Sequence, residues 1–149
     1  MGAIEFTSRV PRPRRQALER LLFFNGCQDR VARDIVDVID KYGPPEIIDD
    51  GEGLRVRVAS MPDVQCLFAV ERDTERPIGV AVYVRADLEH VTVLHLGVAE
   101  DYCAGGVNES ETLPLRLVRE VKRSSRRIKG VRRLEVAYCT QRARASSAL

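Results

Sequence analysis

The stretch that decides the fold begins VTVLHLGVAEDYCAGG at residues 91–106 and resumes as LPLRLVREVKRSSRRIKGVRRLEVAY at residues 113–138. Its apolar start predicts a strand over 91–98, and apolar residues at helical spacing predict a helix over about 113–128, closed by Gly130. A further strand is predicted over 131–138, with Leu134 and Val136 on one face. A strand, a crossover helix and a second strand form a βαβ unit, which should be right-handed and parallel.

The residues before this unit predict the rest of an α/β (α+β) mixed sheet. A short first strand is predicted from Ile4 to Val10, followed by helices over 14–24 and 29–42, the second capped by Asp29. Three more strands are expected, at residues 54–58, 66–71 and 78–84. Short connections favour an antiparallel meander of these strands with the strand at 91–98.

Length and composition indicate one compact domain over residues 1–140, followed by a basic tail, 141–149, that we expect to be frayed. No apolar run approaches the roughly 20 residues that span a bilayer, and the N-terminus lacks the features of a signal peptide, so a cytoplasmic location is expected. The cysteines are widely separated without C-x-x-C spacing, which favours reduced thiols and gives no support to a metal site; they are Cys27, Cys66, Cys103 and Cys139.

Charge is distributed unevenly along the chain, although the net charge is only +2. Residues 21–115 hold 18 acidic and 8 basic residues, whereas residues 116–149 hold 11 basic and 2 acidic ones. A basic C-terminal part behind an acidic body could attract nucleic acid or an acidic partner. The simpler interpretation is the solvated face of one helix and a terminal tail.

The quoted stretch resembles the central half of the GCN5-related N-acetyltransferases (GNAT). In that family the strand ends in a valine and leads through a tyrosine into a loop of the pattern Q/R-x-x-G-x-G/A; here Val98 and Tyr102 stand at those positions. The segment LFAVERDTERPIGVAVYV, residues 67–84, is similar to the family's preceding strands. The resemblance covers about Cys66 to Tyr138 and implies a GNAT-like fold that binds acetyl-CoA.

The resemblance implies a cofactor-binding segment at the end of the strand and in the loop after it. Backbone amides of a glycine-containing loop, with a helix N-terminus, can hold a pyrophosphate. The residues concerned are Gly97, Val98, Cys103, Ala104, Gly105, Gly106 and Val107. Cys103 replaces the arginine or glutamine of the family, and Glu109 and Glu111 precede the helix, where their charges would repel the pyrophosphate or take its place.

Direct acetyl transfer needs a base for the attacking ammonium and an acid for the leaving thiolate. Glu100 and Asp101 are the candidate bases at the strand end, and Tyr138 is the candidate acid on the neighbouring strand. The alternatives are solvated loop carboxylates and a rim aromatic side chain. Cys103 and Cys139 follow the same strand ends. They could form a redox pair, one of them could accept an acyl group, or both could be inert, packed side chains. His95 is expected to share the face of Val91 and Val93 as a satisfied, buried histidine.

Two functions therefore follow as expectations. The first is a GNAT-like acyl-CoA-binding protein that moves acetyl from acetyl-CoA to an unidentified amine. The alternative is a non-catalytic GNAT-like module for dimerisation or partner binding, because the sequence ends about ten residues after Tyr138, so that a second subunit completes the sheet or the catalytic end is missing. An open edge on the last strand favours a homodimer in either case. Nucleic-acid binding through Arg116, Arg119, Arg123, Arg126 and Arg127 is the weakest expectation, since no aromatic residues are interleaved.

Overall fold

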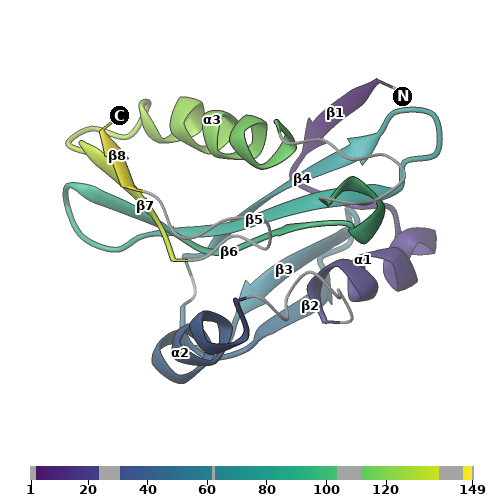
Figure 1. Cartoon of the computed structure of the whole chain (residues 1–149), viewed down its shortest axis with the longest axis horizontal. Helices are drawn as coiled ribbons and strands as arrows, with labels where there is room; N and C mark the ends of the chain where they lie inside the picture. Colours follow the sequence, from purple (N-terminus) through teal and green to yellow (C-terminus); the bar gives the residue numbers. More distant parts are fainter. Residues whose placement is uncertain (1–2, 24–30, 62, 104–111, 138–145, 149) are drawn as a thin grey trace.

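A computed structural model of the chain describes residues 3–23, 31–61, 63–103, 112–137 and 146–148. Its elements form three layers (Figure 1). A six-stranded sheet lies in the middle, one helix covers one face, and two helices with a small second sheet cover the other. Each face of the main sheet buries its own apolar cluster.

The main sheet has the strand order β1-β4-β5-β6-β7-β8. Its strands are β1 (Ile4–Thr7), β4 (Gln65–Glu71), β5 (Pro77–Arg85), β6 (His90–Val98), β7 (Arg133–Val136) and β8 (Ser146–Ala148). Neighbours pair antiparallel except β6 and β7, which are parallel. The mixed sheet with one parallel pair, predicted from the sequence, is confirmed.

The helices form where apolar residues recur at helical spacing. They are α1 (Arg15–Leu22), α2 (Ala32–Tyr42) and α3 (Leu113–Ser125), with short 3-10 helices η1 (Arg12–Arg14) and η3 (Glu100–Tyr102). In α3, Leu113, Leu117 and Val121 recur every four residues and are fully buried against the sheet. α2 ends at Gly43, whose φ of 98° favours glycine.

The second sheet differs from the sequence prediction. β2 (Pro45–Asp49) pairs antiparallel with β3 (Leu54–Val58), whereas the sequence predicted no strand at 45–49 and placed 54–58 in the main meander. Gly51 and Gly53 have positive φ angles of 92° and 143°, which fold β3 back onto β2. Val56 and Val58 of β3 then pack into the apolar cluster under the main sheet.

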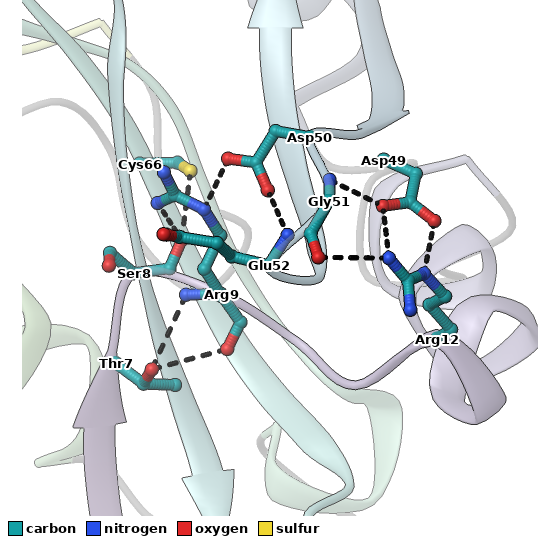
Figure 2. A network of polar contacts seen from close by, with 9 residues as sticks. All are labelled: Thr7, Ser8, Arg9, Arg12, Asp49, Asp50, Gly51, Glu52 and Cys66. Atoms are coloured by element: carbon teal, nitrogen blue, oxygen red, sulfur yellow. Dashed lines mark hydrogen bonds and ion pairs between the residues drawn. The ribbon is translucent and has the colours of Figure 1, made fainter.

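Charged side chains tie the segment after β1 to this hairpin (Figure 2). Arg9 Nε lies 2.6 Å from Asp50 Oδ2, and the Arg12 guanidinium pairs with the Asp49 carboxylate. Between them, Val10 and Leu54 exchange backbone hydrogen bonds of 2.9 and 2.8 Å. The hydrogen bond from Arg12, followed by one from the Gly51 N–H, lowers the pKa of Asp49. The hairpin and the N-terminal segment thus form one unit beneath the sheet.

The end of the chain also departs from expectation. Residues 146–148, in the tail expected to fray, form β8 and pair with β7 in the register Arg133↔Ala148. β8 therefore lies along the outer edge of β7, the edge on which the expectation of a homodimer rested; dimerisation itself stays a prediction. None of the helices in the described part of the chain is both long enough and apolar enough to cross a membrane.

Candidate functional site

Among the described residues, the parallel pairing of β7 with β6 ends partway along β6. Their register runs from His90↔Arg133 to Val93↔Val136, and Ala137 N–H then donates to the Val93 carbonyl at 2.9 Å. β6 continues to Val98, paired on its other side with β5. In open α/β sheets, ligands bind outside the carboxyl ends of strands where neighbours diverge. The second half of β6 is therefore the candidate binding edge.

A β-bulge lies at the point of separation. On β5, Tyr83 faces Val93 and Val82 faces His95, so that Leu94 is an extra residue in β6. A bulge bends its strand and often lies beside an active site. It also moves His95 onto the face of Val82, which packs toward α1 and the hairpin. The prediction that His95 shares the face of Val91 and Val93 was wrong for this reason.

His95 is buried, as the sequence predicted. Its side chain is 3% exposed, and burial lowers its pKa from 6.5 to about 4. Removing an imidazolium from water costs free energy, so the neutral ring is favoured. His95 is therefore an uncharged core residue at neutral pH.

Directly after β6, η3 is held by a polar clamp. We use this name for Glu71, Arg76, Asp101 and Tyr102. Tyr102 donates its hydroxyl hydrogen to Glu71 Oε2 at 2.7 Å. Arg76 donates to Glu71 Oε1 at 3.0 Å and to Asp101 Oδ2 at 2.6 Å, and its guanidinium lies 5.7 Å from the centre of the Tyr102 ring. The clamp fixes the chain that leaves β6 to the turn between β4 and β5.

The clamp determines the protonation states of its members. Burial disfavours the Glu71 carboxylate, but hydrogen bonds from Tyr102 and Thr74 and the charge of Arg76 outweigh it, so the pKa of Glu71 is lowered. Burial, together with the neighbouring Glu71, raises the pKa of Tyr102 to about 12. Tyr102 is 1% exposed. It is a neutral, structural hydrogen-bond donor and not a group available for proton transfer.

A cavity of about 740 Å³ opens beside η3. It lies between the η1–α1 segment, the start of β5 and the end of β6, and its lining includes Arg14, Arg20, Arg76, Glu100 and Asp101. Arg76 and Asp101 already pair with each other there. Glu100 is exposed and presents a second carboxylate at the cavity. Cationic and anionic groups thus line one concave surface, where they can orient a polar ligand.

The predicted site residues are only partly within the described chain. Ala104, Gly105, Gly106, Val107 and Tyr138 lie outside it. The described ones gather at the end of β6. Glu100 and Asp101 line the cavity, whereas the side chain of Val98 is buried under α3. Their roles in binding or catalysis stay predictions.

Gly97 faces α1, and Cys103 is buried. A Cβ added to Gly97 would lie 3.6 Å from the Leu21 carbonyl oxygen, an ordinary contact, so the end of α1 lies over β6 at this point. Cys103 is 3% exposed, and its Sγ lies 3.4 Å from the Val98 carbonyl oxygen. It is disulfide-bonded, where the sequence predicted a reduced thiol. Cys27 and Cys139 lie outside the described residues.

The arginines of this site were not predicted from the sequence. Arg76 precedes Pro77 in the connection between two predicted strands, and Arg14 lies at a helix start. Each was one of many arginines in the chain, with no motif around it. Arg76 reaches Asp101, 25 residues away, only because β5 and β6 bring their ends together. No local pattern could have identified it.

Comparisons with known proteins show similarity to acetyltransferase structures. An acetyltransferase from Streptococcus agalactiae 2603 matches at a TM-score of 0.53 and 17% identity, over 91% of this chain and 73% of the other. A GNAT family acetyltransferase from Elizabethkingia anophelis with acetyl-CoA bound matches at a TM-score of 0.49 and 16% identity, over 89% of this chain and 63% of the other. Arabidopsis thaliana NAA60 in complex with a bisubstrate analogue matches at a TM-score of 0.44 and 21% identity, over 90% of this chain and 73% of the other.

These similarities concern the fold. No protein-family model matches the sequence, and no curated protein matches it. The first similarity named above, together with the order of strands and the single parallel pair, confirms the GNAT-like fold predicted from the sequence.

Proposed function

We propose that the chain binds an acyl-CoA where β6 and β7 separate and transfers the acetyl group to an amine. One observation carries this proposal: the parallel register ends at Val93↔Val136, whereas β6 runs on to Val98. Pantetheine is an extended chain with two amide groups. A strand edge can bind such a chain through backbone hydrogen bonds, as it binds an added strand.

The diphosphate of the same ligand would lie beyond the end of β6. The chain leads from there through η3 toward the first turn of α3, which begins at Leu113. Amides at a helix N-terminus favour an anion. The polar clamp supports this arrangement because it fixes the first residues after β6 relative to the sheet. Cys103 begins the segment expected to cradle the diphosphate.

Glu100 is the base that we assign to the reaction. It must take a proton from the ammonium so that the neutral amine can attack the thioester carbonyl carbon; the carbon–sulfur bond then breaks, and the thiolate takes up a proton. Glu100 lines the cavity and is exposed, and the adjacent Asp101 lines it too and pairs with Arg76 at 2.6 Å. An exposed carboxylate at the cavity is within reach of a substrate ammonium. Tyr138 remains the proposed acid.

Calorimetric titration of the full chain with acetyl-CoA and with CoA tests the binding step. We expect binding in the micromolar to millimolar range usual for enzyme substrates. Release of free thiol from acetyl-CoA in the presence of a panel of primary amines then tests transfer. Absence of binding heat at millimolar acetyl-CoA would overturn the proposal.

A non-catalytic module is the alternative outcome of the same experiment. Two features favour it: Asp101 is already paired with Arg76, and Tyr102 is committed to Glu71. In that case acetyl-CoA binds without thiol release or does not bind, and sedimentation velocity reports whether the chain associates with a second copy.

A further inference from the structure

The outer surface of α3 carries a groove lined by basic side chains. We call it the α3 basic groove; it has a volume of about 420 Å³ and is lined by Leu115, Val118, Arg119, Lys122, Arg123 and Arg126. It lies on the side of α3 that faces away from the main sheet, because Leu113, Leu117 and Val121 occupy the opposite side. It is distinct from the cavity beside η3.

The basic residues follow one stripe of the helix. Arg119, Lys122 and Arg126 are spaced three and four residues apart, which places them on the same side at intervals of about 5 Å along the axis. Arg123 lies beside them and pairs with Glu120 at 3.2 Å. Among the described residues, no carboxylate forms an ion pair with the other three.

The positive surface extends beyond the helix. Residues 116–133 contain nine basic residues and a single acidic one, Glu120. Past the end of α3, Arg127, Lys129, Arg132 and Arg133 are exposed. Arg116 is excluded, because its guanidinium lies 5.5 Å from the centre of the Phe6 ring, over β1. Arg116 therefore packs against Phe6 and is not part of the groove, unlike the other basic residues of α3.

We propose that the α3 basic groove binds the phosphate backbone of a nucleic acid. Arginines dominate the surface, and a guanidinium donates two parallel hydrogen bonds to a phosphate. A row of basic groups about 5 Å apart can contact several phosphates of one duplex strand, which recur every 3.4 Å along its axis, although the two spacings do not match one to one. The recognition is of charge and not of sequence, because the groove presents no aromatic side chain for base stacking.

An anionic membrane fits the same surface less well. An interfacial helix buries an apolar face in the lipid. The apolar face of α3 already packs on the sheet, and along the helix only Leu115, 58% exposed, is a largely exposed apolar residue. Phosphates held in a groove between basic side chains require no such face.

Fluorescence anisotropy of the full chain with labelled 20-nucleotide single-stranded RNA and 20-base-pair DNA tests the proposal. We expect a dissociation constant of about 1–100 µM near physiological salt, as is typical of binding through the backbone. The logarithm of affinity should fall linearly with the logarithm of salt concentration, with a slope of about −2 to −4 for three to four phosphate contacts.

The variant R119Q/R123Q/R126Q should weaken binding at least about tenfold and reduce the magnitude of the slope by about two to three, one for each lost contact. The matched control is R33Q/R57Q/R72Q, which removes the same charge from α2, β3 and the β4–β5 turn. It should retain most of the affinity. Equal weakening by both variants would show that net charge, not the groove, is responsible.

Two further results would overturn the proposal. One is the absence of nucleic-acid binding at 100 µM protein and 50 mM salt. The other is binding to vesicles of phosphatidylserine, or to polyglutamate, with at least tenfold higher affinity than to nucleic acid, since the groove would then serve a membrane or an acidic protein segment. Circular dichroism of each variant confirms that it is folded.

Discussion

Tyr102 and Glu71 join the ends of two strands that are not neighbours. Glu71 ends β4, Tyr102 follows β6, and β5 lies between those strands, yet the hydroxyl donates to the carboxylate at 2.7 Å. Arg76 reinforces the link from the turn between β4 and β5. The segment that follows β6 is therefore held by contacts with the end of β4, on the other side of β5. The candidate site depends on these contacts.

Replacing Tyr102 by phenylalanine should lower the free energy of unfolding by about 1–3 kcal/mol. The change leaves the ring in place but removes a partly buried hydrogen bond to a charged group. Urea unfolding of Y102F, E71Q and the double variant measures the coupling, which we expect to be about 1 kcal/mol or more. Additive effects of the two changes would show that the bond contributes no net stability.

Two glycines on adjacent strands should respond differently to alanine. A Cβ at Gly79 would lie 2.8 Å from Leu117 Cδ1, so the buried side chain must move; at Gly97 the nearest atom would be 3.6 Å away, an ordinary contact. We expect G79A to destabilise the protein by about 1–3 kcal/mol through overpacking under α3. G97A is the matched control and should change stability by less than about 0.5 kcal/mol. Thermal or urea unfolding of both variants decides the point.

Stability should decline below pH 6.5 because of His95. Its pKa is lowered to about 4 by burial, so between pH 6.5 and 4 the unfolded chain binds a proton that the folded chain does not. The stabilisation is fully present above pH 6.5 and is lost as the pH falls toward 4, by about 3 kcal/mol in total.

Urea midpoints measured at intervals from pH 7.5 to 4.5 check this decline. H95Q, which cannot titrate, should flatten the curve in this window. H90Q removes the other histidine, at the start of β6, and should retain the decline. A curve of unchanged slope in H95Q would contradict the prediction.

Under the proposed function, the two carboxylates of η3 should separate into different roles. E100Q should reduce kcat for acetyl transfer by about 10²-fold or more, with little change in acetyl-CoA affinity, because it removes the base. D101N should instead weaken the clamp, since Asp101 pairs with Arg76. Its main effect should be a loss of stability of about 1 kcal/mol. A kcat unaffected by E100Q would remove Glu100 from the reaction.

Local patterns were sufficient for most elements of the fold. The apolar spacing of residues 113–121 placed α3 on the sheet, and the run from Val91 to Val98 marked β6 within one residue. Both signals depend on neighbouring residues alone. β2 was not predicted because the segment 45–49 is short and starts with a proline. Its partner β3 was predicted as a strand but was assigned to the wrong sheet. Pairing between strands is a non-local choice that the sequence of one strand does not specify.

The candidate site shows the same division. Glu100 and Asp101 were predicted from their place at a strand end, which a linear pattern can indicate. That Asp101, beside Glu100 in the lining of the cavity, pairs with a guanidinium depends on Arg76, which lies in the turn between β4 and β5. The bulge at Leu94 places His95 on the opposite face of the sheet from the one predicted. It follows from the register of β6 with β5, and no pattern in the sequence of β6 predicts it.

The sequence by itself determined the βαβ unit from Val91 onward, because the helical and strand periodicities depend only on the order of apolar and polar residues along the chain. It also determined the concentration of positive charge after Leu115. Only the tertiary structure decided where the parallel strands separate, at Val93 and Val136, and which arginines share the outer groove of α3. Both depend on packing between residues distant in the chain, where the register of strands and the burial of one helix face select among arrangements that the local sequence allows.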